Sequence, residues 1–346
     1  STFIAISGAS PGIPNIGALA RASKGGTRQI GCGRADPHLR CGRPWPRPIV
    51  IRSMRTPSPS ARLVFTYGLA TLLTVATGCL VCALSGVPTV TWLRNLIAWG
   101  VGAGAAGGLA VVAGRRTGLV LLGVAVAGLA ASLAGTPQDG VRRWLDVGPL
   151  HINVAFIVLP AAVVALAWHR ERLWAWGLAI ILLGLLVVQP DASQATALGL
   201  ALGVIAVRAP LSTRRRVGII AITTVLAVAA WLRPDPLQPI PEVEGIVTLA
   251  AAVNPGLAGL AVALLIVTAL APGFMARTAG PVGGTGGLAL STYCLATVAT
   301  TLFGAFPVPL LGIGMSPVLG FWLGVGLLAA GLRPGAEPAP TPGSGS

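Results

Sequence analysis

The run LWAWGLAIILLGLLVV, residues 173–188, holds sixteen consecutive residues without a charge. A membrane β-strand would alternate lipid-facing and lumen-facing residues over segments of about ten positions, and this run does not alternate. A bilayer offers no hydrogen-bond partner to an open backbone, so an apolar run of this kind spans it as a helix, which needs about 20 residues. The stretch therefore predicts a transmembrane helix.

The rest of the chain has the same character. Of its 346 residues, 54% are hydrophobic and only 10% are charged, whereas a soluble domain carries about 25% charged residues. We therefore expect an all-α polytopic membrane protein with about ten transmembrane helices. The predicted spans are 64–86, 96–114, 117–135, 152–168, 173–188, 192–207, 217–232, 245–271, 285–306 and 309–331. The eighth span is interrupted at Asn254-Pro255-Gly256 and is expected to be a short piece followed by a full helix.

The two ends of the chain differ from the predicted membrane domain, residues 61–332. Residues 1–60 mix Gly, Pro, Ser and Arg without apolar periodicity, which predicts a disordered basic extension. Met54 is an alternative translation start for a chain whose given sequence opens on Ser1. Residues 333–346 are rich in Pro, Gly and Ser and are expected to be a disordered tail.

The net charge of +15 does not indicate a nucleic-acid partner. Ten of the 24 basic residues precede residue 63, and the others lie at span ends. Of the 17 arginines from Arg52 onward, 13 fall in one set of alternating loops. The positive-inside rule then predicts a bacterial inner-membrane protein with both termini in the cytoplasm.

The cysteines and histidines do not predict a metal site. Cys79 and Cys82 form a CxxC inside an apolar span, where they are expected to be buried small residues. His151 and His169 are placed on opposite sides of the membrane and cannot share a metal. We expect no cofactor.

Three predicted outer loops hold most of the unexplained polar residues. The first is GTPQDGVRRWLDVGPL, residues 135–150, which holds Arg142 and Arg143 although the positive-inside rule expects few arginines in outer loops. The planar guanidinium of arginine suits phosphate groups. The alternative is structural: an Arg142–Asp146 or Arg143–Asp139 pair, with Trp144 as an interface anchor.

The other two loops contain acids and Gln189. In Gln189-Pro190-Asp191, the aspartate is either a functional acid near the membrane or the cap of the next helix. In the proline-rich stretch 233–245, Glu242 and Glu244 are either caps of the following helix or a source of a general base.

Four stretches give the chain a resemblance to the SEDS family (shape, elongation, division and sporulation; the FtsW/RodA/SpoVE family). They are GVRRWLDVG (140–148), QPD (189–191), PEVEG (241–245) and PVPLLGIGMSP (307–317). The resemblance implies a ten-helix protein of peptidoglycan synthesis in cell division or cell shape, with a polyprenyl-pyrophosphate-linked sugar as substrate and a penicillin-binding-protein-like transpeptidase as partner. The substrate-binding residues that we expect are Arg142, Arg143, Trp144, Gln189, Asp191 and Glu242. Glu244 is the candidate general base.

The chain departs from the family at two motifs. The family's Q-P-S-E-x-x-K corresponds here to NVAF (153–156) with Leu159 at the lysine position, and the catalytic aspartate falls on Gly245. Glycosyltransferase activity therefore stays open against two alternatives: an inactive scaffold that binds the transpeptidase, and a permease or lipid flippase. A transporter is expected to place polar groups at the middle of the membrane, and the predicted spans are almost free of charge there.

Overall fold

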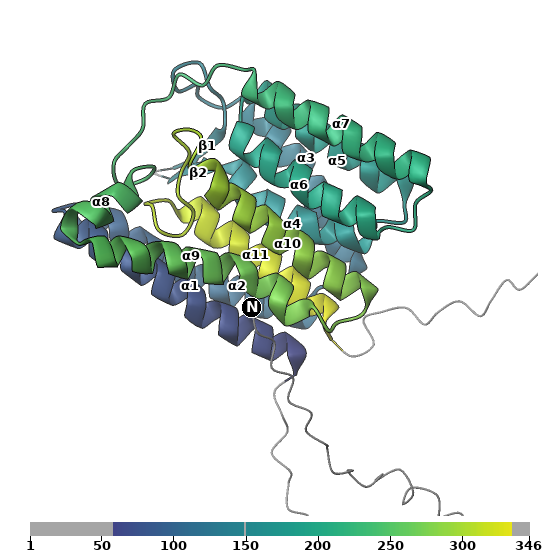
Figure 1. Ribbon diagram of the computed structural model, residues 1–346, viewed down its shortest axis with the longest axis horizontal. Coiled ribbons are helices and arrows are strands. Elements are labelled where there is room, and N and C mark those ends of the chain that lie inside the picture. The colour runs from purple at the N-terminus through teal and green to yellow at the C-terminus, as the bar shows by residue number, and fades with distance from the viewer. Residues whose placement is uncertain (1–57, 149, 334–346) are drawn as a thin grey trace, which may run out of the picture. The chain divides into compact units, whose positions relative to one another are not determined.

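The computed structural model describes residues 58–148 and 150–333, which contain eleven helices and one two-stranded sheet (Figure 1). The predictions of a disordered extension and tail fall on residues outside this part of the chain, apart from a few at its edges. The helices are α1 Pro59–Leu84, α2 Thr89–Val112, α3 Arg115–Ser132, α4 Val154–Trp168, α5 Leu173–Val188, α6 Ala192–Arg208, α7 Thr213–Trp231, α8 Ile246–Val253, α9 Pro255–Ala276, α10 Pro281–Thr300 and α11 Met315–Gly331.

The membrane character of these helices is confirmed. Five helices, α1, α2, α3, α9 and α10, are long and apolar enough to cross a membrane, and α4, α5, α6 and α11 are shorter apolar helices. The first helix begins five residues before its predicted span, because the hydroxyl of Ser58 accepts a hydrogen bond from the amide of Ala61 and Pro59 occupies the first turn.

The predicted interruption of the eighth span is also confirmed. The chain leaves the helical conformation at Asn254, because the ring of Pro255 disfavours a helical residue before it. The side chain of Asn254 accepts a hydrogen bond of 2.7 Å from the amide of Gly256 and starts α9. The result is a short α8 followed by the 22-residue α9.

The small sheet corrects the all-α prediction. Strands β1, Trp144–Val147, and β2, Leu150–Asn153, form an antiparallel hairpin in which Asp146 faces His151. We expected an irregular loop here. The strands have only four residues each, too few to show the alternation that identifies a strand in a sequence.

Helices α4, α10 and α11 are the most enclosed, and Figure 1 places them between one group formed by α1, α2 and α9 and another formed by α3, α5, α6 and α7. Close packing of α11 depends on glycine. A Cβ at Gly326 would lie 2.6 Å from the Cα of Ala106 in α2, and one at Gly324 would lie 2.9 Å from the Cβ of Pro160 in α4.

Helix α2 carries Gly100, Gly104 and Gly108 at a GxxxG spacing, which is typical of closely packed membrane helices, but these glycines do not form its packing face. A Cβ added at Gly100, Gly104 or Gly108 would meet nothing within 4 Å. The residue that requires glycine is Gly102, where a Cβ would lie 2.6 Å from Trp322 of α11.

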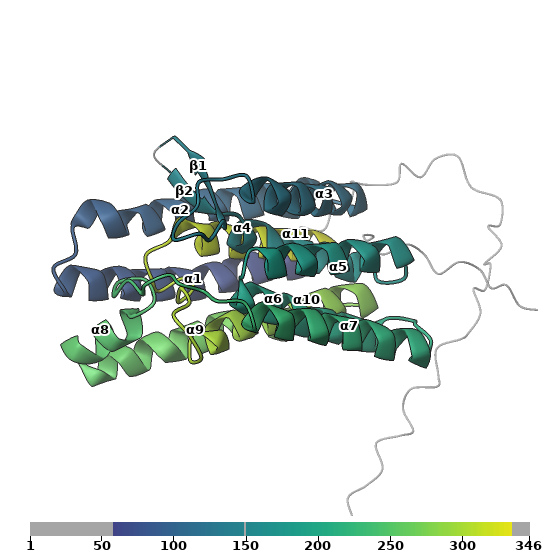
Figure 2. The same cartoon turned by 90° about the horizontal axis from the view of Figure 1, so that it is seen from above.

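Two loops are fixed to each other at the end of the bundle that carries the hairpin, which we call the hairpin end (Figure 2). Buried Asn95 donates to the carbonyl of Gly312 at 2.9 Å and accepts from the amide of Gly314 at 3.0 Å. The amide of Ile313 donates to the carbonyl of Glu242 at 2.9 Å. The residues before α8 and the residues before α11 are therefore held side by side.

Candidate functional site

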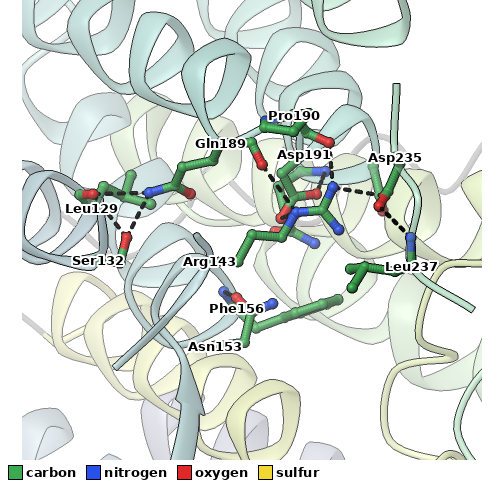
Figure 3. Close-up of polar contacts among 12 residues, drawn as sticks. Leu129, Ser132, Arg143, Asn153, Phe156, Gln189, Pro190, Asp191, Asp235 and Leu237 are labelled. Atoms are coloured by element: carbon green, nitrogen blue, oxygen red, sulfur yellow. Dashed lines mark hydrogen bonds and ion pairs between the residues drawn. The ribbon is translucent and has the colours of Figure 1, made fainter. Parts of the chain in front are cut away.

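Arg143 is the centre of a buried polar network at the hairpin end (Figure 3). The residue directly precedes β1, and its side chain is 6% exposed. Its Nε donates to the carbonyl oxygen of Gln189 at 3.1 Å, and its Nη2 donates to the carbonyl oxygen of Pro190. Arg143 therefore joins the hairpin to the connection between α5 and α6.

Two carboxylates neutralise the guanidinium of Arg143. Oδ2 of Asp235 lies 2.7 Å from Nη2, and Oδ2 of Asp191 lies 3.9 Å from Nε. Asp235 comes from the proline-rich loop after α7, so the network spans three loops that are distant in the sequence (Figure 3). The side chains of Arg143 and Asp191 have both lost most of their water. Such a buried ion pair is favourable only if its geometry is kept.

Asp235 was absent from the sequence-based candidates. Its position between Pro234 and Pro236 was the available signal, because two prolines hold an aspartate in an extended, exposed segment with few local partners. Its Oδ1 accepts from the amide of Leu237, which fixes the loop on its far side.

Asp191 has the capping role that was one of its two predicted alternatives, and it also lies near Arg143. As the N-cap of α6, it accepts a hydrogen bond of 3.1 Å from the amide of Gln194 through Oδ1. Its other oxygen faces Arg143. The side chain therefore caps a helix and belongs to the charged network.

Gln189 ties this network to α3. Its Nε2 donates to the carbonyl of Leu129 at 2.8 Å and to the hydroxyl of Ser132 at 2.6 Å, while Oε1 is buried without a hydrogen-bond partner among the described residues. Gln189 is fully buried. Its contacts fix the position of the carbonyl that Arg143 binds.

Arg142 does not contact this network and instead lines an open groove of about 590 Å³. The groove is also lined by Asp139, Pro190 and Arg233, and neither of its arginines forms a salt bridge with a described residue. Arg142 donates once, to the carbonyl of Leu133 at 2.9 Å. The groove therefore has two cationic side chains from two different loops, Arg142 and Arg233. Arg143, the neighbour of Arg142 in the sequence, does not line it.

The structural alternatives for the first loop do not form. Asp146 pairs with His151 across the hairpin, with 2.5 Å between Oδ1 and Nδ1, and this hydrogen bond lowers the pKa of Asp146. Trp144 stacks on the same histidine, with ring centroids 5.3 Å apart and planes at 18°. Gln138 contacts the other ring nitrogen of His151 at 2.6 Å. Trp144 is thus part of the hairpin's own side-chain cluster.

Glu242 and Glu244 lie on the turn before α8, and neither side chain caps this helix with a hydrogen bond. The N-cap of α8 is Gly245, without a side-chain hydrogen bond. Glu244 instead accepts a hydrogen bond of 2.7 Å from the amide of Ile240 through Oε2. Burial raises the pKa of Glu244, and the charges of Glu242 and Asp235 raise it further. Glu244 therefore interacts electrostatically with the acid that pairs with Arg143.

The predicted residues thus form separate groups. Arg143, Gln189 and Asp191 are in direct contact, Arg142 lines the groove beside them, and Trp144 belongs to the hairpin. Glu242 and Glu244 are not among the residues that line the groove.

Comparisons with known proteins agree on the fold. No family model matches the sequence, and no curated protein matches it. A chain from a solved structure on the coordination of polymerization and crosslinking by a peptidoglycan synthase complex is similar over 78% of this chain and 97% of its own, with a TM-score of 0.57 and 21% identity. The rod shape determining protein RodA of Thermus thermophilus is similar over 78% of this chain and 96% of its own, with a TM-score of 0.50 and 23% identity.

These similarities, together with the apolar helices, define a multi-pass membrane fold. It is the RodA fold, so the resemblance that the four sequence stretches carry is confirmed at the level of structure.

Proposed function

We propose that this protein is a divergent SEDS-type protein of peptidoglycan synthesis in cell division or elongation, which binds a polyprenyl-pyrophosphate-linked sugar precursor in the groove at the hairpin end. The observation that carries the proposal is the placement of Arg142 and Arg233 on that groove, from two loops, where Asp139 also lies but neither arginine forms a salt bridge with a described residue. Two guanidinium groups suit the two phosphates of a pyrophosphate, because each gives parallel charge-assisted hydrogen bonds.

The buried network gives this groove a fixed wall. Arg143 binds the carbonyl of Pro190, a residue that lines the groove, and the carboxylate of Asp235, next to the groove residues Pro234 and Pro236. In this proposal Arg143, Gln189 and Asp191 act as positioning residues that hold the two sides of the groove together.

The membrane orientation belongs to the same proposal. The hairpin end carries all the described acids except Glu171, while most arginines lie at the opposite end. With ten spans, the positive-inside rule places the groove on the outer face of the inner membrane and both termini in the cytoplasm.

If the chain is a glycosyltransferase, Glu244 is the candidate general base. It would take the proton of the attacking hydroxyl while the bond between the sugar C1 and the pyrophosphate oxygen breaks, and the arginines would stabilise the charge of the leaving group. Burial raises the pKa of Glu244, which favours proton uptake.

The test is polymerisation of a fluorescent lipid-linked disaccharide by the purified full chain in detergent. We expect glycan polymer from the wild type, none from the double variant Arg142→Gln/Arg233→Gln, and none from Glu244→Gln, which should still bind the precursor. Binding without polymer in the wild type would exclude the transferase and leave precursor binding. Absence of binding would overturn the proposal.

A second candidate is an inactive scaffold for a penicillin-binding-protein-like transpeptidase. Two observations favour it: Gly245 stands where the family has its aspartate, and one carboxylate oxygen of Glu244 is occupied by the amide of Ile240. Co-purification of the membrane-extracted protein with a partner that reacts covalently with labelled penicillin would support this function, especially if Glu244→Gln leaves the association unchanged.

A further inference from the structure

A second polar pocket lies at the end of the bundle opposite the hairpin. It is enclosed between the α2–α3 turn, the end of α4, the start of α10 and the end of α11. Its volume is about 110 Å³, which exceeds the space of about 10–15 Å³ that a single water requires. It belongs neither to the groove nor to the Arg143 network.

The pocket is positively charged. Arg115 and Arg333 both line it, and none of the described residues that line it is acidic. Neither arginine forms a salt bridge with any residue in the described part of the chain. The guanidinium of Arg333 donates hydrogen bonds to the carbonyls of Val111 and Ala113, which hold its charge at the pocket.

A buried donor without a partner lies against the same pocket. Trp168, at the end of α4, is 6% exposed and lines the pocket. Its Nε1 has no hydrogen-bond acceptor among the described residues. An unsatisfied buried donor destabilises the folded state, and an acceptor placed in this pocket would remove that cost.

The backbone adds further donors. Helix α10 begins at the pocket, with Gly280 as its N-cap and Val282 and Gly283 in its first turn. The amides of Val282 and Gly283 have no acceptor within the described ranges. A helix N-terminus carries a partial positive charge and donates to anions. Close packing excludes a side chain here, since a Cβ at Gly283 would lie 2.9 Å from Cδ2 of Leu332.

We propose that this pocket binds the phosphate of an anionic phospholipid headgroup, held by Arg115, Arg333, the indole N–H of Trp168 and the first amides of α10. A lipid is the favoured source because the pocket lies at the end of apolar helices, where headgroups lie in a membrane. The site does not depend on the proposed function of the groove.

The test is a lipid titration of the purified full chain in detergent, followed by the thermal unfolding midpoint and by native mass spectrometry. The probes are phosphatidylglycerol, phosphatidylcholine with the same acyl chains, and inorganic phosphate. We expect phosphatidylglycerol to raise the midpoint, because a ligand that binds only the folded state stabilises it. Arg115→Gln should weaken its apparent affinity about fivefold, as expected for one basic residue near an anionic headgroup.

The matched control is Arg116→Gln, which changes the neighbouring arginine that does not line the pocket and should bind like the wild type. Trp168→Phe keeps an aromatic ring and removes the donor, and should also weaken binding. Equal losses in Arg115→Gln and Arg116→Gln, or equal effects of the two lipids, would overturn the proposal. A response to inorganic phosphate without a response to phosphatidylglycerol would overturn the lipid assignment.

Discussion

Nη2 of Arg143 lies 2.7 Å from Oδ2 of Asp235, a residue 92 positions later in the chain. This contact connects the loop before the hairpin with the proline-rich loop after α7. Because the same guanidinium also binds the carbonyls of Gln189 and Pro190, one side chain fixes the relative position of three loops. The shape of the adjacent groove depends on it.

Replacement of Arg143 should therefore destabilise the protein more than replacement of its neighbour. Arg143→Gln leaves the buried carboxylate of Asp191 without a counter-charge, and breaking a buried pair in this way costs about 3–5 kcal/mol. Arg142→Gln changes an exposed side chain and should stay within about 0.5 kcal/mol of the wild type. Thermal unfolding in detergent measures the stability of both variants. Equal stability would contradict the stabilising role of the contacts around Arg143.

Two glycines of α2, two residues apart, should respond differently to the same change. Gly102→Ala places a Cβ 2.6 Å from Trp322 and should cost about 1–3 kcal/mol through overpacking. Gly104→Ala meets nothing within 4 Å and should be neutral or slightly stabilising. The unfolding midpoints of the two variants test the packing of α2 against α11. A lower midpoint for Gly104→Ala than for Gly102→Ala would show that α2 is wrongly placed against α11.

Glu244 should make stability fall as the pH rises. Burial raises its folded-state pKa above the ordinary value of 4.5, so the folded state favours the protonated form. Its stabilising contribution is complete below the unfolded-state pKa and is lost as the pH rises through the folded-state pKa. Glu244→Gln should therefore unfold at a higher temperature than the wild type at pH 7.5, and the two should converge near pH 4. A difference that is constant with pH would contradict the raised pKa.

Reporter fusions test the orientation. Fusions at Gln138 and Gln238 should be active only with a reporter that works outside the cytoplasm, because both residues lie at the hairpin end. Fusions at Arg172 and Arg277 should show the opposite. A cytoplasmic signal at Gln138 or Gln238 would reject the proposed topology.

Much of the fold could be predicted from the sequence because hydropathy and proline act locally. Apolar runs located the helices, and Asn254-Pro255 located the break between α8 and α9. The hairpin was missed because its strands are short, and the GxxxG spacing failed because glycine spacing does not tell which face of α2 meets a partner.

The site was harder to predict because its contacts are distant in the sequence. The pattern QPD suggested either a cap or a functional acid for Asp191; the structure shows the cap, and the ion pair with Arg143 was not predicted. Asp235 could not be paired with Arg143 from sequence, since the sequence does not show where a loop between two helices lies relative to a residue 92 positions earlier. Adjacency of Arg142 and Arg143 suggested one phosphate clamp, but the two side chains diverge: one is buried in the network and the other lines the groove.

The proposal that Arg142 and Arg233 bind a pyrophosphate in the groove can be tested by the affinity of the purified protein for a polyprenyl pyrophosphate. We predict that Arg142→Gln and Arg233→Gln each weaken binding about tenfold, the loss of one charge-assisted contact of about 1.5 kcal/mol. Arg94→Gln, at the same end of the bundle but outside the groove, should bind like the wild type. Unchanged affinity in both groove variants, or an equal loss in Arg94→Gln, would contradict it.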